Sequence, residues 1–276
     1  MLFLCHLEVC ALTEVRELLE QLKRGECSID DAEKKLRLFN ILEIARLAKL
    51  DINREARKGI PEVVWARHKT VGDLVQIVEH ASKVIPSILI SHLSKDQEIN
   101  LRKHLEKNVV LDVYADGAIV VAHQKNYKPP KTGGKVGIVA AGTSDRHVAE
   151  QARVMAEQMG CDTFVAYDVG IAGVHRLFPE LSEMIEKGID VLIVAAGMEG
   201  ALPSLVTGLV DIPVIGLPVS TGYGLGEEGL GALIAMLQSC SLGLAVVNID
   251  NGVGAGAIAA LVANRIAKKQ RDPRTQ

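Results

Sequence analysis

The chain of 276 residues is long enough for one large domain, or for a domain of about 150 residues with a smaller one. Hydrophobic residues make up 48% and charged residues 24% of it, which excludes a disordered or acidic solvating protein. A formal net charge of −3 and an aromatic content of 3% argue against a nucleic-acid partner, which needs a basic surface or base-stacking side chains.

Cysteine usage and hydropathy indicate the compartment. Five cysteines, with no C-x-x-C pair, fit a reducing environment better than a disulfide framework. No apolar run reaches the roughly 18–20 residues that a membrane helix needs, and the apolar start lacks the basic region of a signal peptide. We therefore expect a cytoplasmic protein with no membrane partner.

A composition break divides the chain into two predicted domains, 1–128 and 129–276. The first holds only four of the 25 glycines, at positions 25, 59, 72 and 117. A Pro-then-Gly stretch at 127–134 suits a linker between the two.

The first half is predicted to be a small α+β domain. Apolar spacing from Val15 to Leu22 predicts a helix that ends at Gly25, and a second helix begins near Ser28 and continues through Leu47 to end before Asp51. A charged turn over 51–62 leads to strands at 63–64 and 87–90 and to a hairpin of 109–114 with 118–122. Within that turn, Arg54, Arg57 and Lys58 are most simply a solvated face, with a phosphate-holding role as the alternative.

The second half alternates strands and helices. Strands are expected at 135–141, 163–169, 190–196, 214–218 and 243–249, with helices ending near 159 and spanning about 177–187, 229–239 and 256–269. Because the strands are continuous Val, Ile and Ala runs, both of their faces should be buried by helices. The predicted fold is a three-layer, doubly wound α/β domain with a parallel sheet.

Four polar, glycine-rich loops follow these strands, at 142–145, 197–203, 220–224 and 248–254. They meet at the carboxyl edge of the sheet, where small residues and helix N-termini favour an anionic ligand; the alternative is that the glycines only serve tight turns. Residues 224–229 match G-x-G-x-x-G, but this segment lies late in the domain and its two glutamates would repel a pyrophosphate. The sequence has no Walker A motif and no metal-spaced cluster, so no metal site is predicted.

The residue types alone leave three further positions open. Cys240 lies between a helix and the last strand, where a cysteine is more often a small buried hydrophobe than a nucleophile. His147 and His175 are near the loops, and each is more simply a structural polar residue than a ligand.

Taken together, the motifs in these loops resemble the LarB family. The resemblance is carried by 141–145, 167–176, 196–204, 222–224, 239–240 and 247–252, and Asp51–Glu62 resembles the same family. LarB proteins are carboxylase/hydrolases that begin synthesis of the nickel-pincer nucleotide cofactor of lactate racemase. Their C-terminal domain is similar to the PurE-type aminoimidazole ribonucleotide carboxylase/mutase fold, so the resemblance implies a PurE-like domain here.

The chain departs from these patterns at three positions. Ala201 stands where PurE-type enzymes carry a catalytic histidine before the Leu-Pro pair, which argues against the purine reaction. His147 replaces a common proline, and His68 breaks the usual Gly-Lys-Thr before Thr70.

The resemblance implies nicotinic acid adenine dinucleotide as substrate and CO2 or bicarbonate as co-substrate, with loss of AMP. Cys240 is then the nucleophile that activates the pyridinium ring, and Glu199 and Asp168 are the candidates for proton transfer. NAD would be a non-productive analogue, and Mg²⁺ on the pyrophosphate is compatible with the chemistry. The implied substrate-binding residues are Gly142, Thr143, Ser144, Asp145, Arg176, Gly197, Met198, Gly200, Ser220, Gly222, Tyr223, Gly224, Asn248, Asp250, Asn251 and Gly252.

PurE-type domains form octamers, so the resemblance also implies a homo-oligomer. Leu202, Leu205, Leu209 and Val210 are apolar enough for its interface, with core packing as the alternative. Two other functions stay open at this point: a PurE-like enzyme acting on an aminoimidazole ribonucleotide, and a nucleotide-binding module without catalysis.

Overall fold

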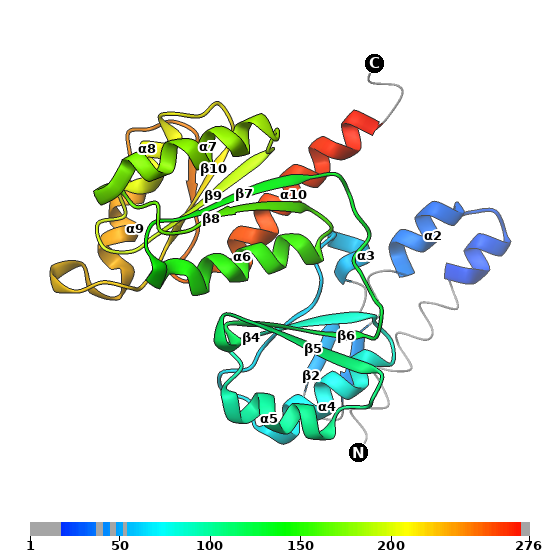
Figure 1. Cartoon of the computed structure of the whole chain (residues 1–276). Helices are drawn as coiled ribbons and strands as arrows, with labels where there is room; N and C mark the ends of the chain where they lie inside the picture. Colours follow the sequence, from blue (N-terminus) through cyan, green and yellow to red (C-terminus); the bar gives the residue numbers. More distant parts are fainter. Residues whose placement is uncertain (1–17, 37–40, 45–47, 52–53, 272–276) are drawn as a thin grey trace.

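The computed structural model describes residues 18–36, 41–44, 48–51 and 54–271, which are built mainly on a four-stranded and a five-stranded sheet (Figure 1). Residues 18–23 are helical, whereas Val15 and the apolar start of the chain lie outside the described residues. None of the described helices combines the length and the apolar character needed to cross a bilayer.

The N-terminal unit is built on a four-stranded sheet of order β3-β4-β6-β5. Its elements are β3 (Val63–Trp65), α4 (Val71–Ser82), β4 (Ser87–Ser91), α5 (Lys95–His104), β5 (Val109–Tyr114) and β6 (Ile119–Gln124). Strands β3 and β4 run parallel, and the other pairs are antiparallel. The predicted strands and hairpin are confirmed, whereas the sequence analysis missed α4 and α5, each of which begins with a capping box.

Two predictions for residues 28–62 are wrong. The helix expected up to residue 51 ends as α2 (Ile29–Leu36), and β1 (Ile41–Ile44) pairs antiparallel with β2 (Ala48–Asp51). Ile44 and Leu50 of this ribbon are buried with the N-terminal core, so tertiary packing overrides the helical spacing. The charged turn contains the short helix α3 (Arg54–Lys58), whose arginines pair with Asp51 and Glu62.

The C-terminal unit is a five-stranded parallel sheet of order β11-β10-β9-β7-β8. Its strands are β7 (Lys135–Ala140), β8 (Asp162–Ala166), β9 (Val191–Ala196), β10 (Val214–Pro218) and β11 (Leu244–Val246). One face packs on α6 (Arg146–Gln158) and α10 (Gly252–Arg271), the other on α7 (Leu177–Glu186), α8 (Leu202–Thr207) and α9 (Leu230–Leu237). The predicted three-layer α/β fold is confirmed.

The two units share a hydrophobic core. Leu89, Ile119 and Val121 on the N-terminal sheet belong to the same buried cluster as the side chains of α6 and α10. This common packing fixes how the N-terminal sheet lies against the C-terminal unit.

Small residues let α6 and α10 approach closely. A Cβ atom on Gly256 would lie 2.4 Å from the Ala152 carbonyl oxygen, and one on Gly252 would lie 2.3 Å from the Val148 carbonyl oxygen. Both contacts are with backbone atoms, which cannot move aside as a flexible side chain can. The helix crossing therefore depends on glycine at these two positions.

We expect Gly256→Ala to lower the free energy of unfolding by about 1–3 kcal/mol, because the added methyl group forces α6 and α10 apart. Chemical denaturation followed by circular dichroism measures this. The control is Gly208→Ala, where the backbone is helical and the nearest neighbour is 3.4 Å away. It should change stability by less than about 1 kcal/mol. Equal losses in the two variants would contradict the proposed steric cause.

Candidate active site

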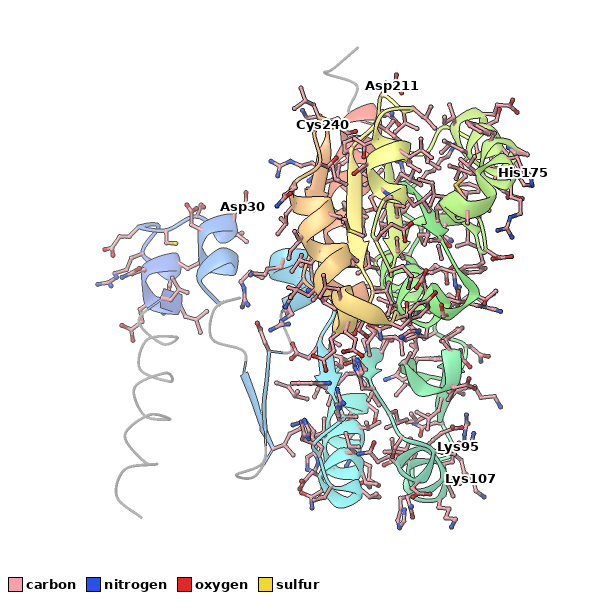
Figure 2. The ribbon with its side chains drawn as sticks, turned by 90° about the vertical axis from the view of Figure 1, so that its left-hand side faces the viewer. Asp30, Lys95, Lys107, His175, Asp211 and Cys240 are labelled. Carbon is pink, nitrogen blue, oxygen red and sulfur yellow. The ribbon has the colours of Figure 1, made fainter. Side chains whose placement is uncertain are left out.

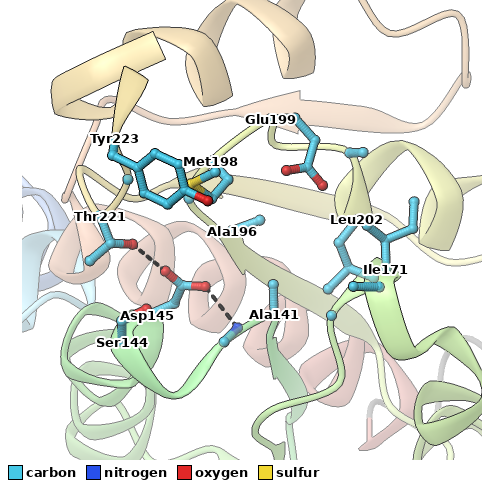
Figure 3. Close-up of a pocket in the computed structure, with 16 residues that line it drawn as sticks. Ala141, Ser144, Asp145, Ile171, Ala196, Met198, Glu199, Leu202, Thr221 and Tyr223 are labelled. Atoms are coloured by element: carbon cyan, nitrogen blue, oxygen red, sulfur yellow. Dashed lines mark hydrogen bonds between the residues drawn. The ribbon is translucent and has the colours of Figure 1, made fainter. Parts of the chain in front are cut away.

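A pocket of about 450 Å³ opens at the carboxyl edge of the parallel sheet, where β7 and β9 lie side by side (Figure 3). The chain leaves β7 toward α6 on one face and β9 toward α8 on the other, so their loops diverge and leave a crevice. Four loops line it, with Ala141, Gly142, Ser144, Asp145, Gly170, Ile171, Ala172, Ala196, Gly197, Met198, Glu199, Ala201, Leu202, Thr221, Gly222 and Tyr223.

The carboxylate of Asp145 joins two of these loops. Its side chain is buried, and Oδ2 accepts a hydrogen bond of 2.8 Å from the backbone N–H of Gly142. Oδ1 accepts a hydrogen bond from the hydroxyl of Thr221, which follows β10 (Figure 3). These two hydrogen bonds hold the loops after β7 and β10 together as one wall of the pocket.

The loop after β9 depends on two glycines. A Cβ atom on Gly197 would lie 2.3 Å from the Thr221 carbonyl oxygen, which also accepts the Met198 N–H at 3.1 Å. Gly200 has a φ of +61°, and a Cβ atom there would lie 2.6 Å from the Ala232 carbonyl oxygen. The tight turn holds Glu199 between them on the pocket wall (Figure 3).

Glu199 is the carboxylate of this pocket that is exposed and not held by a hydrogen bond within the described residues. Of the two carboxylates among the described lining residues, Asp145 is held by hydrogen bonds, whereas no hydrogen bond engages the exposed Glu199. The rest of the lining is mostly small or apolar, and Tyr223 is 79% exposed at the rim. The arrangement offers one proton acceptor in a largely apolar crevice.

Asp168 and Arg176 lie next to the pocket but do not line it. They form an ion pair between Nη1 of Arg176 and Oδ2 of Asp168, on an exposed surface between β8 and α7. Each charge therefore already has a partner. Of the two acids predicted for proton transfer, the structure brings only Glu199 into the pocket.

Cys240 lies at the opposite end of the same sheet from the pocket, where the parallel strands begin. It is exposed and precedes β11, whose first residues pair with the start of β10, whereas the pocket lies beyond the ends of β9 and β10. The next residue, Ser241, donates a hydrogen bond of 2.8 Å to the Ser204 carbonyl oxygen. In Figure 2, Cys240 appears at the same end of the domain as Asp211, which precedes β10. A single chain thus does not bring Cys240 to Glu199.

The other described cysteines differ from Cys240. Cys161 is buried, and burial raises the pKa of its thiol to about 11, so it is protonated at neutral pH. Cys27 belongs to the segment before α2, far along the chain from the loops. Neither supplies a thiolate to the pocket.

The loop after β11 supports the site without lining this pocket. Asp250 accepts a hydrogen bond of 2.9 Å from the Ser220 N–H, and Asn251 accepts one of 2.9 Å from the Gly254 N–H at the start of α10. Asn248 accepts the N–H of Ile249, and Gly252 packs on α6. Thr143 lines a neighbouring cavity, and Gly200, Ser220 and Gly224 lie in the loops outside the lining.

Several lining residues were not predicted from the sequence. Thr221 carries the hydroxyl that fixes Asp145, and its position directly after a predicted strand was the available signal. The others, Ala141, Gly170, Ile171, Ala172, Ala196 and Leu202, are glycine or apolar and carry no chemical signature, and Ala201 was predicted only as a departure from the PurE-type pattern. Among the described residues, no group of three or more His, Cys, Asp or Glu side chains could hold a metal ion.

Comparison with known proteins finds two family matches that together cover most of the chain. Residues 135–275 match the AIR carboxylase family, and residues 42–124 match the LarB/PurE-like N-terminal domain. An uncharacterized protein of Methanocaldococcus jannaschii is 46% identical over 259 residues, which are 92% of this chain and 98% of that protein.

Relatives that match about half of this chain carry an enzyme name. The N5-carboxyaminoimidazole ribonucleotide mutase of Thermotoga maritima is 33% identical over 132 residues, 46% of this chain and 74% of that protein. The mutase of the same name from M. jannaschii is 36% identical over 139 residues, 48% of this chain and 83% of that protein.

We expect Thr221→Val to lower the free energy of unfolding by about 1–3 kcal/mol, because it removes a donor from a buried carboxylate oxygen. Thr221→Ser keeps the hydroxyl and should lose much less. Thermal or chemical denaturation of the two variants gives the comparison. If valine and serine cost the same, the hydrogen bond to Asp145 does not stabilise the loops.

Proposed function

The chain belongs to the AIR carboxylase family, as a LarB-like protein with a PurE-like domain, and we propose that it carboxylates the pyridinium ring of nicotinic acid adenine dinucleotide and then releases AMP. The observation that carries this proposal is the composition of the pocket at position 201. Ala201 lines it where PurE-type enzymes have their catalytic histidine. A methyl group cannot transfer a proton, so the alternative reaction on an aminoimidazole ribonucleotide lacks its acid/base. The match to a LarB N-terminal domain favours the same choice.

The proposed reaction begins with a thiolate. Pyridinium ring carbons are electron-poor and do not attack CO2, but a thiolate that adds para to the ring nitrogen gives a dihydropyridine. Its enamine carbon, next to the addition site, forms a bond to the carbon of CO2. A base then removes the proton from that ring carbon, and the thiolate leaves as the ring becomes aromatic again. The net change replaces one ring hydrogen by a carboxylate, with no external oxidant or reductant.

The pocket suits this sequence. Glu199 is the carboxylate available to take the ring proton, and the largely apolar lining favours a flat organic ring and CO2 over water. Water would protonate the enamine carbon in place of carboxylation. Hydrolysis of the phosphoanhydride then separates AMP from the dicarboxylated mononucleotide.

The proposed nucleophile requires a second copy of the chain, because Cys240 and the pocket occupy opposite edges of the sheet. Exposed apolar side chains surround both places. Leu237 and Leu242 flank Cys240 and are 65% and 96% exposed, and Tyr223 and Leu225 border the pocket rim. Leu230 and Ile234 extend the exposed face along α9. Association through these side chains would bury apolar area and can bring Cys240 of one copy to the pocket of another.

The proposed interface therefore differs from the one expected from the sequence. Leu202 is 1% exposed and belongs to the core, and Leu205 and Val210 pack against the same cluster. Only Leu209 of that set is exposed, at 46%. The octamer expected from the resemblance stays a prediction, with α9 as its proposed contact.

The predicted role of the arginines in binding the pyrophosphate is also revised. Arg176, Arg54 and Arg57 are paired with Asp168, Glu62 and Asp51, so a pyrophosphate would compete with carboxylates for them. If Mg²⁺ takes part, the pyrophosphate oxygens and water are its natural ligands, because the described residues offer no cluster for it.

The direct test is incubation with nicotinic acid adenine dinucleotide and ¹³C-bicarbonate, with and without Mg²⁺, followed by mass spectrometry. We expect AMP and a mononucleotide that carries one labelled carboxylate. An unlabelled substrate recovered intact would support a non-catalytic nucleotide-binding module, and carboxylation of aminoimidazole ribonucleotide would support the purine alternative. Either result would overturn the proposal.

We expect Cys240→Ala to fold and bind the dinucleotide but to lose carboxylation, because neither of the other two described cysteines, Cys27 and Cys161, offers a thiolate to the ring. The parent enzyme should also form an adduct with NAD that absorbs as a dihydropyridine, and Cys240→Ala should not. Near-parental carboxylation by Cys240→Ala would end the covalent mechanism.

Mixing two inactive variants tests whether the site is shared. Cys240→Ala chains keep the pocket, and Glu199→Ala chains keep the thiol, so hybrid assemblies should recover roughly a quarter of the parental activity. Each variant assembled alone is the control and should stay inactive. Hybrids without activity would mean that Cys240 acts on the pocket of its own chain or not at all.

A further inference from the structure

The N-terminal unit presents a second polar surface beside the pocket. Strands β3 and β4 are parallel, so their carboxyl ends meet at one edge, with Trp65 opposite Ser91 in register. The segments that follow them carry Arg67 and His68 after β3 and His92 after β4. This is the only parallel pair in that sheet, and it ends in a set of cationic and aromatic side chains.

Trp65 is the one tryptophan of the chain, and it is 56% exposed. Its ring lies 5.6 Å from that of His68 and 6.3 Å from that of His92, in edge-on geometry. An exposed indole held between two imidazoles is poorly explained by core packing. It offers a flat surface on which an aromatic base can stack.

A cavity of about 390 Å³ adjoins this aromatic group. Arg67, His92, Ser94, Asp116 and His147 line it with Leu93, Gln97, Ala115, Gly117 and Ala118. Arg67 forms no ion pair within the described parts of the chain, so its guanidinium is available to an anion. A volume of this size lies within the range of small-ligand sites, about 300–1,000 Å³.

Groups from both units converge here. Partial burial lowers the pKa of His92, the guanidinium of Arg67 and the neighbouring His147 lower it further, and the Asp250 carboxylate opposes them. His147 and Asp250 come from the carboxyl edge of the C-terminal sheet, so this edge faces the edge of β3 and β4. The ring of His147 donates from Nδ1 to the Ser144 carbonyl oxygen at 2.8 Å, so Nε2 is left for a ligand and donates to a phosphate when the ring carries its second proton.

The backbone that carries these groups is held in place. Gln97 donates hydrogen bonds of 3.1 and 2.8 Å to the carbonyl oxygens of Ala66 and Lys69, which frame Arg67. Leu93 donates one of 2.8 Å to the Gly117 carbonyl oxygen, and a Cβ atom on Gly117 would meet Leu93 at 2.2 Å. The surface is preformed and needs little ordering to bind.

A third cavity lies between the cavity of about 390 Å³ and the candidate active site and shares lining residues with each. This larger cavity, of about 690 Å³, shares Ala115, Asp116 and His147 with the smaller one and Ser144 with the pocket. The larger cavity also contains Arg146, whose guanidinium lies 5.0 Å from the Tyr167 ring. A ligand with two linked ends could therefore occupy both the pocket and the edge of β3 and β4.

We propose that the edge of β3 and β4 is a binding site for a purine nucleoside 5′-monophosphate group, with the purine stacked on Trp65 and the phosphate held by Arg67 and His147. Resting on the function proposed above, this group is the adenylate half of the dinucleotide, and the pyridinium half occupies the pocket. The N-terminal unit then binds the part of the substrate that leaves as AMP.

The test is titration of the full chain with AMP alone, followed by the emission of its single tryptophan. AMP and nicotinic acid adenine dinucleotide should both change the emission, and nicotinic acid mononucleotide should not. Arg67→Ala should weaken AMP binding about tenfold, the effect of one charge-assisted hydrogen bond. The matched control is Lys107→Ala, an exposed cation of the same unit that lies outside these cavities (Figure 2) and should bind AMP as the parent does.

No change of emission with AMP, an equal change with the mononucleotide, or equal affinity of Arg67→Ala and Lys107→Ala would overturn the inference. Its failure is distinct from failure of the proposed function. A chain that carboxylates the dinucleotide but ignores AMP loses only this site. A chain that binds AMP through Arg67 but never carboxylates loses only the reaction.

Discussion

The candidate site depends on a buried carboxylate, that of Asp145. It holds the N–H of Gly142 after β7 and the hydroxyl of Thr221 after β10, across the intervening strand β9. The β9 loop is then confined by Gly197, which has no room for a side chain beside Thr221. One charge-assisted pair of hydrogen bonds thus sets the width of the crevice into which Glu199 projects. Because these hydrogen bonds already fix the shape of the crevice, few reactive side chains are needed within it.

Much of the C-terminal domain follows from its sequence because burial on both faces leaves a plain signal. Strand β9 is buried at all six positions, as its uninterrupted run of Val, Leu, Ile and Ala predicts. The β1–β2 ribbon was missed because its apolar residues also fit a helix, and only packing of Ile44 and Leu50 decides between the two. The ion pair of Asp168 with Arg176 could not be foreseen either, since the two residues are eight positions apart across a loop and a 3-10 turn.

The order of helices and strands along the chain is enough to predict at which end of the sheet Cys240 lies. In a parallel sheet, a residue between a helix and the following strand lies at the amino edge, and ligands gather at the carboxyl edge. The order of α9, Cys240 and β11 already implied that the thiol and the glycine-rich loops of one chain are apart. The exposed apolar face of α9, with Leu230, Ile234 and Leu237, joins the two edges along the outside of the domain. The prediction from residue types did not use the rule that ligands gather where parallel strands end. It therefore placed Cys240 and the glycine-rich loops in one site of a single chain.

The two proposals meet at the start of α6. With the pyridinium half in the pocket and the adenylate half at Trp65, the phosphoanhydride lies over residues 143–147, which border both cavities. Asp145 is the residue just before α6, but its side chain does not cap the helix. Its carboxylate accepts hydrogen bonds from the Gly142 N–H and the Thr221 hydroxyl instead. The 3-10 turn of residues 143–145 runs directly into α6, and the Arg146 N–H donates to the Thr143 carbonyl oxygen, so the guanidinium of Arg146 is the group that favours negative charge at that place. The bond that breaks would thus lie between a thiol site completed by another copy and a base site supplied by the same chain, which makes the N-terminal unit part of the reaction and not only of the fold.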